Sequence, residues 1–322
     1  MAKCIGSTTL DTAPGTYLYS LAQSNTTFAT IGSDDSLRLF DGSLALLHKA
    51  LPAHNGISCL SPFQSGFATA GRDALVHCWD IRATKSALSI SEPKGTAISA
   101  LATNNTLLAI GTESAKEGLG DVSVSLFDTR NPAIPLRSYA DSHTDSITQL
   151  AFHPTQPNIL LSGSTDGLVS LFDITQADEE DALQQVLNPR SAVHCAGFLS
   201  ANEVFVLTTD ECFAIYNLSE DTSGSAQEFG NVRPALQCSY VVDVITSARP
   251  PAMVFGDHER EVLGIVPLDE ARGWEFGPRV ELPGAHGEEI VRDLALLHGE
   301  GKAVSCGEDG RVRAWDLAGV AG

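Results

Sequence analysis

The chain has 322 residues, and its 40 Asp and Glu against 20 Lys and Arg give a formal net charge of −20 and a pI near 4.7. Such a negative field repels phosphate, which argues against direct binding of DNA or RNA. The N-terminal MAKCIGSTTL lacks the apolar core of a signal peptide, and no apolar run reaches the roughly 18 residues of a membrane span. We therefore expect a soluble intracellular protein that does not bind membranes.

Short runs of alternating apolar residues, broken by Pro, Asn, Asp and Gly, follow one another along the chain. Alternation with period two, interrupted by turn residues, is typical of antiparallel strands joined by hairpins. The clearest unit is 142–174, in which three such runs end at Phe172-Asp173. This unit recurs at intervals of 39 to 48 residues, and repetition at that period predicts a repeat architecture.

An aromatic residue followed by Asp closes most repeats, and another Asp lies six residues before the aromatic. In chain order the closing pairs are Phe40-Asp41, Trp79-Asp80, Phe127-Asp128, Phe172-Asp173, the weaker Tyr216-Asn217, and Trp315-Asp316. One further repeat is expected near Val266-Pro267. This spacing places repeats at 14–41, 44–80, 86–128, 134–173, 184–217, 230–268 and 278–316, each beginning with the outer strand of the preceding sheet.

The two ends of the chain predict how the last repeat is completed. Residues 310–317 have the pattern of its third strand, and we expect residues 3–10 to supply the fourth, which would cover an exposed sheet edge.

Three places depart from the repeat. TESAKEGLG (112–120) predicts an inserted, mobile surface loop, and QADEEDA (176–182) predicts an acidic connection that starts a short helical turn. The segments 219–235 and 246–261 surround the least regular repeat, the sixth.

These repeats resemble those of the WD-repeat family. The resemblance implies an all-β fold, a seven-bladed WD-repeat β-propeller closed by its N-terminal strand and forming a single domain over 1–322. Within it, the chain most resembles the family of WD repeat-containing protein 89, through HTDSITQLAFHP, NILLSGSTDGLVSLFDI, DEEDAL and GEDGRVRAWDL. That resemblance implies a nuclear or cytoplasmic scaffold.

The resemblance also implies a buried hydrogen-bonded set of His, Ser or Thr, Asp and Trp within a repeat. The matching residues are His54, Thr69, Asp73 and Trp79 in one repeat, His286, Ser305, Asp309 and Trp315 in another, and His143, Ser162 and Asp166 in a third. The third set is incomplete because Phe172 has no indole N–H to donate. A catalytic Ser-His-Asp group uses the same residue types, but catalysis does not explain why the set recurs. We therefore interpret the sets as structural.

Residues just after the His and just before the turn Asp face the narrow end of the propeller in this family. By that resemblance Asp145, Ser146, Thr165, Glu288, Glu289, Glu308 and Arg72 would line one entrance, here termed the acidic entrance. An acidic surface attracts a basic protein or peptide, although acidity can also serve solubility alone. Our preferred hypothesis is a scaffold that escorts or assembles a basic nuclear or ribosomal protein.

A second hypothesis rests on two consecutive endings of the form W/F-D-x-R. Trp79-Asp80-Ile81-Arg82 and Phe127-Asp128-Thr129-Arg130 resemble the box by which some propellers bind the adaptor of cullin-4 ubiquitin ligases. Arg82 and Arg130 would then make bidentate contacts with the adaptor. The alternative is that Arg simply follows the closing pair in repeats that never bind a ligase.

The chain carries no pattern that predicts chemistry. It has no Gly-rich phosphate loop, no nucleophile elbow and no closely spaced His and Cys residues, so we expect no enzyme activity, cofactor or metal. We also expect the protein to be a monomer. Its seven scattered Cys residues have mostly apolar neighbours, which favours buried free thiols over disulfides or metal ligands.

Overall fold

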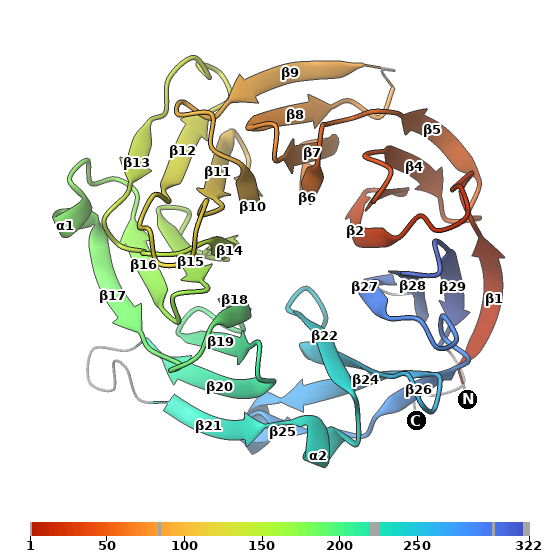
Figure 1. The fold of residues 1–322 in the computed structure, drawn as a ribbon. Coiled ribbons are helices and arrows are strands. Elements are labelled where there is room, and N and C mark those ends of the chain that lie inside the picture. Colours follow the sequence, from red (N-terminus) through yellow and green to blue (C-terminus); the bar gives the residue numbers. More distant parts are fainter. Residues whose placement is uncertain (1, 83–84, 219–225, 298–299, 318–322) are drawn as a thin grey trace. The chain divides into compact units, whose positions relative to one another are not determined.

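β-Strands dominate the computed structural model, which describes residues 2–82, 85–218, 226–297 and 300–317 (Figure 1). Within these residues the strands form seven antiparallel sheets, six of four strands and one of five. The described helices α1 (Glu179–Ala182) and α2 (Arg233–Leu236) and the 3-10 helix η1 (Glu270–Arg272) are single turns. Each sheet is one blade, so the predicted all-β, seven-bladed β-propeller is confirmed.

The chain divides into two compact units. The first unit comprises residues 1–53, 81–85 and 233–322, and the second unit comprises 54–80 and 86–232. The expectation of a single domain over 1–322 stays a prediction.

The first unit contains blades 1, 6 and 7. Blade 1 is built from β2 (Leu18–Ser24), β3 (Thr27–Gly32), β4 (Leu37–Asp41) and β5 (Leu46–Ala50). Blade 6 is built from β22 (Tyr240–Ile245), β23 (Ala252–Asp257), β24 (Val262–Asp269), β25 (Glu275–Phe276) and β26 (Val280–Pro283), the last two both pairing with β24. Blade 7 is built from β27 (Val291–Leu297), β28 (Lys302–Gly307), β29 (Val312–Asp316) and β1 (Lys3–Thr8).

The second unit contains blades 2 to 5. Blade 2 is built from β6 (Ile57–Phe63), β7 (Gly66–Gly71), β8 (Leu75–Trp79) and β9 (Ser86–Ser91), and blade 3 from β10 (Ile98–Asn104), β11 (Leu107–Thr112), β12 (Val124–Asp128) and β13 (Arg137–Tyr139). Blade 4 is built from β14 (Ile147–Phe152), β15 (Ile159–Ser164), β16 (Val169–Asp173) and β17 (Leu183–Leu187). Blade 5 is built from β18 (Val193–Phe198), β19 (Glu203–Thr208), β20 (Cys212–Asn217) and β21 (Ala226–Asn231).

The N-terminal strand completes the last blade, as predicted. β1 pairs antiparallel with β29, from Lys3 opposite Asp316 to Thr8 opposite Val312. Most of the predicted segment 3–10 therefore lies in the sheet. The pairing covers the edge of β29, whose backbone groups would otherwise be open to another chain.

The burial pattern follows the position of each strand in its blade. The second strands of blades 1 and 2, β3 (TFATIG) and β7 (GFATAG), are buried along their whole length and consist only of Gly, Ala, Ile, Phe and Thr. The outer strand β9 (SALSIS) instead alternates between exposed residues and residues that are buried or partly buried. Neighbouring blades within each unit share their apolar side chains, as where Leu161 and Val169 of blade 4 pack with Val193 and Val206 of blade 5.

The sequence repeats begin one strand before the sheets, as expected. The repeat 44–80, for example, starts with β5, which pairs with β4 of the preceding blade. The sixth blade, which lacks an aromatic-Asp ending, is nevertheless complete in its described residues: Val266 and Pro267 lie in β24, opposite Met253 and Ala252. Of the irregular segment 219–235, residues 219–225 lie outside the described part of the chain.

Candidate functional site

The predicted set in blade 2 is brought together in the second unit. The indole Nε1–H of Trp79 donates to Thr69 Oγ1 at 2.8 Å, and this hydroxyl lies 2.8 Å from His54 Nε2. His54 Nδ1 lies 3.0 Å from Asp73 Oδ1. Because a carboxylate only accepts, Nδ1 carries the hydrogen, and the Thr69 hydroxyl then donates to Nε2. A single chain of hydrogen bonds therefore runs from the indole to the carboxylate.

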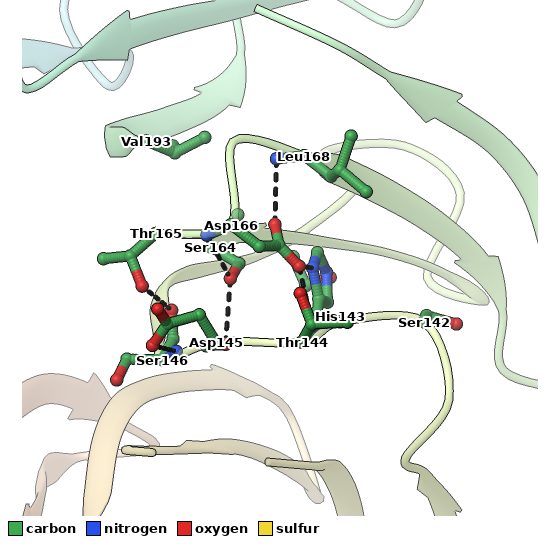
Figure 2. Close-up of polar contacts among 12 residues, drawn as sticks. Ser142, His143, Thr144, Asp145, Ser146, Ser164, Thr165, Asp166, Leu168 and Val193 are labelled. Carbon is green, nitrogen blue, oxygen red and sulfur yellow. Dashed lines mark hydrogen bonds and ion pairs between the residues drawn. The ribbon is translucent and has the colours of Figure 1, made fainter. Parts of the chain in front are cut away.

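The same arrangement recurs in both units. In blade 7, Ser305 Oγ lies 2.8 Å from His286 Nε2 and accepts from Trp315 Nε1 at 2.9 Å, while His286 Nδ1 lies 2.7 Å from Asp309. In blade 4, His143 Nδ1 lies 3.1 Å from Asp166 Oδ2, as Figure 2 shows for the two side chains. The Nε2 of the same ring lies 2.7 Å from Ser162 Oγ. Phe172 is fully buried beside this last set and, as predicted from its side chain, adds no donor.

The Asp of each set is held in its charged form. Burial alone would raise the pKa of Asp73, but hydrogen bonds from the Asn55 N–H and from His54 together bring it below its ordinary value. The pKa values of Asp166 and Asp309 are lowered for the same reason, with burial again opposing the hydrogen bonds from His143 and His286. In each set the hydroxyl and the imidazole are committed to one another inside the blade. They serve packing better than nucleophilic attack, which needs an accessible hydroxyl.

Blade 1 stabilises its turn Asp in a way that sequence reasoning missed. This repeat has no His, and the buried Arg38 binds Asp34 Oδ2 at 2.5 Å and Oδ1 at 3.1 Å. Arg38 Nε also donates to Leu10 O at 3.0 Å, which ties the connection after β1 to blade 1. Arg313 of blade 7 takes the corresponding position, two residues before the aromatic, and donates to Asp309 at 3.1 Å. The sequence signal would have been the shared pattern Arg-x-aromatic-Asp.

Three residues of the acidic entrance meet in the second unit, where Figure 2 shows them. The Ser164 hydroxyl donates to Asp145 O at 2.9 Å, and the Thr165 N–H donates to Ser146 O at 3.0 Å. The Asp145 carboxylate is already engaged, since it accepts the Ser146 N–H at 2.7 Å and the Gly118 N–H at 3.3 Å. Its negative charge therefore also organises the local turn.

The inserted loop of blade 3 is fastened to blade 4. The Ser114 N–H donates to Ser146 Oγ at 2.9 Å, and the Gly120 N–H donates to Thr144 O at 3.1 Å. Within the loop the Ser114 hydroxyl donates to Asp121 at 2.6 Å. The insertion is therefore hydrogen-bonded to the neighbouring blade near both ends, and its mobility stays a prediction.

The remaining entrance residues differ in how accessible their charge is. Arg72, in the second unit, is exposed and paired with Glu113 at 3.0 Å. Glu308, in the first unit, is partly buried and bound by the guanidinium of Arg292. Glu288 and Glu289, also in the first unit, are exposed in the turn after His286. The entrance residues are thus divided between the two units, and several of their charges are locally balanced.

The acidic connection 176–182 has a structural role as well as a charge. It forms α1, as predicted, with Asp178 as N-cap. The Glu179 carboxylate accepts the backbone N–H groups of Ala140, Asp141 and Ser142 at 2.7 to 3.0 Å and the Ser142 hydroxyl at 2.5 Å. This segment is therefore fastened across the chain that leads into His143.

A second carboxylate, Asp293 in β27, joins two blades of the first unit. Its Oδ2 accepts the Leu21 N–H of β2 at 2.7 Å and the Ser20 hydroxyl at 3.0 Å. Burial, assisted by the nearby charge of Asp243, raises the pKa of Asp293 to about 6.

The negative charge is unevenly distributed along the chain. The second unit has 21 Asp and Glu against 6 Lys and Arg, a net charge of −15, whereas the first unit has 19 against 14, a net of −5. Residues 134–232 alone have 14 acidic residues against the two basic residues Arg137 and Arg190. Blades 4 and 5 are therefore the most negative part of the protein.

The two arginines of the W/F-D-x-R boxes lie on exposed turns. Arg82 belongs to the first unit and is exposed. Arg130 belongs to the second unit, and its guanidinium binds Asp128 of the same box at 2.6 Å. An adaptor that uses Arg130 would have to replace this exposed ion pair, which solvent screens.

The seven cysteines all lie in described residues and form no disulfide, and four of them are buried. Burial raises the pKa of the Cys59 and Cys78 thiols to about 11, which makes them unreactive at neutral pH. In the described residues no cluster of His, Cys, Asp and Glu could hold a metal ion, and no helix is long and apolar enough to cross a membrane.

Comparison with known proteins identifies the family. The family described as "WD domain, G-beta repeat" matches this chain at residues 45–80, 134–173 and 278–316. An uncharacterized WD repeat-containing protein of Saccharomyces cerevisiae is 35% identical over 300 residues, covering 88% of this chain and 74% of that protein. One of Schizosaccharomyces pombe is 32% identical over 317 residues, covering 93% and 95%. The WD repeat-containing protein 89 homolog of Dictyostelium discoideum is 26% identical over 208 residues, covering 63% and 55%. The chain therefore belongs to the family of WD repeat-containing proteins, whose β-propellers are typically protein-interaction scaffolds.

Proposed function

We propose that this protein captures a basic segment of another protein by electrostatic attraction, as an escort or assembly factor for a basic nuclear or ribosomal protein. The observation that carries the proposal is the net charge of −15 on the second unit, which is three quarters of the net charge of −20 of the whole chain. A surface of one sign raises the association rate of a partner of the opposite sign and repels partners of the same sign. The proposal includes a nuclear or cytoplasmic location, where such partners are made and assembled.

Several local contacts support an interaction surface over an enzyme. The repeated His, Ser or Thr, and Asp groups are consumed by hydrogen bonds inside their blades. The exposed acidic side chains, by contrast, lie on turns and connections, such as Glu180 and Asp181 of α1. Turns held by a rigid sheet are where binding residues usually lie.

The test is affinity purification of the tagged protein at low salt, followed by mass spectrometry and by binding measurements with the purified partner. Exposed charges are screened beyond about 10 Å at ordinary ionic strength, so the affinity should fall steeply as salt rises. Basic nuclear or ribosomal proteins that dissociate at high salt would support the proposal. A best partner that is not basic, or whose affinity does not change with salt, would contradict it.

The contribution of the acidic entrance is tested separately with Glu288→Lys and Glu289→Lys. Both side chains are exposed in a turn, so the double variant should fold normally. It should weaken binding mainly through a slower association rate. An unchanged association rate would remove these two residues from the binding surface and leave the second unit as the candidate.

A further inference from the structure

A groove between blades 4 and 5 lies within the most acidic part of the second unit. Its volume is about 590 Å³, which is in the usual range for binding pockets. Its lining combines apolar side chains with amide groups: His153, Gln156, Ile159, Leu171, Gln184, Gln185, Ala201, Asn202 and Leu218. Leu171 is buried, Ile159 and Leu218 are partly buried, and Gln156, Gln184 and Asn202 are exposed. The apolar surface therefore lies deeper than most of the amides.

The walls of this groove are fixed before any partner binds. His153 Nε2 lies 2.7 Å from Ala201 O, while its Nδ1 accepts the N–H of Gln156 at 3.0 Å and of Thr155 at 3.2 Å. With Nδ1 accepting, Nε2 carries the hydrogen and donates to Ala201. The ring also packs edge-on against Phe198, with 4.7 Å between ring centroids. One buried imidazole thus joins the turn after β14 to the turn after β18, and a preformed groove costs less entropy to occupy.

Carboxylates flank one side of this groove. α1 leads directly into β17, and the Gln184 side chain that lines the groove donates to Asp181 O at 3.0 Å. The bonds to the 140–142 backbone are made by Glu179, whereas its neighbours Asp178, Glu180 and Asp181 are exposed. One of the two basic residues in 134–232, Arg137, is occupied by the carbonyls of Gln176 and Thr175 at 2.9 and 3.1 Å. The charge beside the groove therefore remains negative.

We propose that this groove binds an extended basic segment in which Lys or Arg alternates with aliphatic residues. This inference rests on the function proposed above and identifies the site at which the basic partner binds. Aliphatic side chains would pack on Leu171 and Leu218, and the exposed amides of Gln184 and Asn202 would bind the backbone of the segment. The cationic side chains would point toward Asp178, Glu180 and Asp181. The choice of a basic occupant follows from the ratio of 14 acidic to 2 basic residues in 134–232.

The probe for this inference is a fluorescent nine-residue peptide of alternating Arg and Leu, measured by anisotropy with the full-length protein at low salt. Ala201→Trp places a large side chain in the groove at an exposed position and should weaken binding by about tenfold, the loss expected when an aliphatic anchor is displaced. Ala201→Ser is the matched control and should bind as the wild type does.

A second variant removes charge without filling the groove. Asp178→Asn, Glu180→Gln and Asp181→Asn together should weaken binding and flatten its dependence on salt, and Asn keeps the N-cap of α1. If charge removal weakens binding and Ala201→Trp does not, the groove is wrong while capture of basic segments stands. If the wild type fails to bind the peptide even at low salt, both the groove and the proposed function are overturned.

Discussion

Ser305→Ala should destabilise this protein more than Ser162→Ala, although both serines are fully buried at the same position of their repeats. The Ser305 hydroxyl lies between two partners, His286 Nε2 at 2.8 Å and Trp315 Nε1 at 2.9 Å. The Ser162 hydroxyl bonds His143 at 2.7 Å, and Phe172 replaces the Trp of its repeat. Leaving a buried polar group unpaired costs about 1–3 kcal/mol. We therefore expect a loss of about 2–4 kcal/mol for Ser305→Ala and about 1–2 kcal/mol for Ser162→Ala.

The assay is chemical denaturation of both variants and the wild type, followed by far-ultraviolet circular dichroism. Ser305→Thr is the matched control, because Thr69 holds the same position in blade 2 with the same hydrogen bonds. It should retain most of the wild-type free energy of unfolding. Equal losses for the two Ala variants, or a larger loss for Ser162→Ala, would refute the view that the indole N–H is an energetically significant member of the set.

Further predictions concern the carboxylates of Glu179 and Asp293 and the two arginines of the W/F-D-x-R boxes. Glu179→Ala should lower the free energy of unfolding by about 2 kcal/mol and speed hydrogen exchange at 140–142, because three N–H groups lose their acceptor. Glu179→Gln should lose less stability than Glu179→Ala. Unchanged exchange in Glu179→Ala would contradict this role. Asp293 has a raised pKa of about 6, so its stabilising protonated form is lost as pH rises from about 4 through 6. Relative to Asp293→Asn, which does not titrate, the wild type should lose up to about 3 kcal/mol over that range, and parallel pH profiles would refute the assignment. Arg82→Ala with Arg130→Ala should leave the partners of the protein unchanged if it is an escort, and should abolish co-purification of a cullin-4 adaptor if it is a ligase receptor.

Local patterns in the sequence predicted the strands and their repetition, and the resemblance to WD-repeat proteins implied the seven-bladed propeller. The His, hydroxyl, Asp and Trp residues of blades 2 and 7 lie in one repeat each, and the resemblance to WD-repeat proteins implied that they meet. The closing strand was predicted because the last repeat has the pattern of only three strands, so residues 3–10 were expected to supply the fourth.

Contacts between distant parts of the sequence could not be read in the same way. In the sequence Arg38 has the pattern of an ordinary strand residue. Its contact with Leu10 O depends on the position of the connection after β1 in the fold. Glu179 is indistinguishable from its acidic neighbours in sequence, and its role depends on backbone groups 37 to 39 residues earlier. The groove likewise joins residues 153 and 201, whose contact depends on how blades 4 and 5 pack. Such features follow from tertiary packing and not from the period of the repeat.

Hydrogen exchange of the full-length protein, with and without the alternating Arg-Leu peptide, tests the central claim most directly. The account predicts slower exchange at 183–187 and 200–203 when the peptide is bound at low salt, and loss of that protection at high salt. Protection confined to the first unit, or protection that persists at high salt, would contradict capture of a basic segment by the acidic second unit.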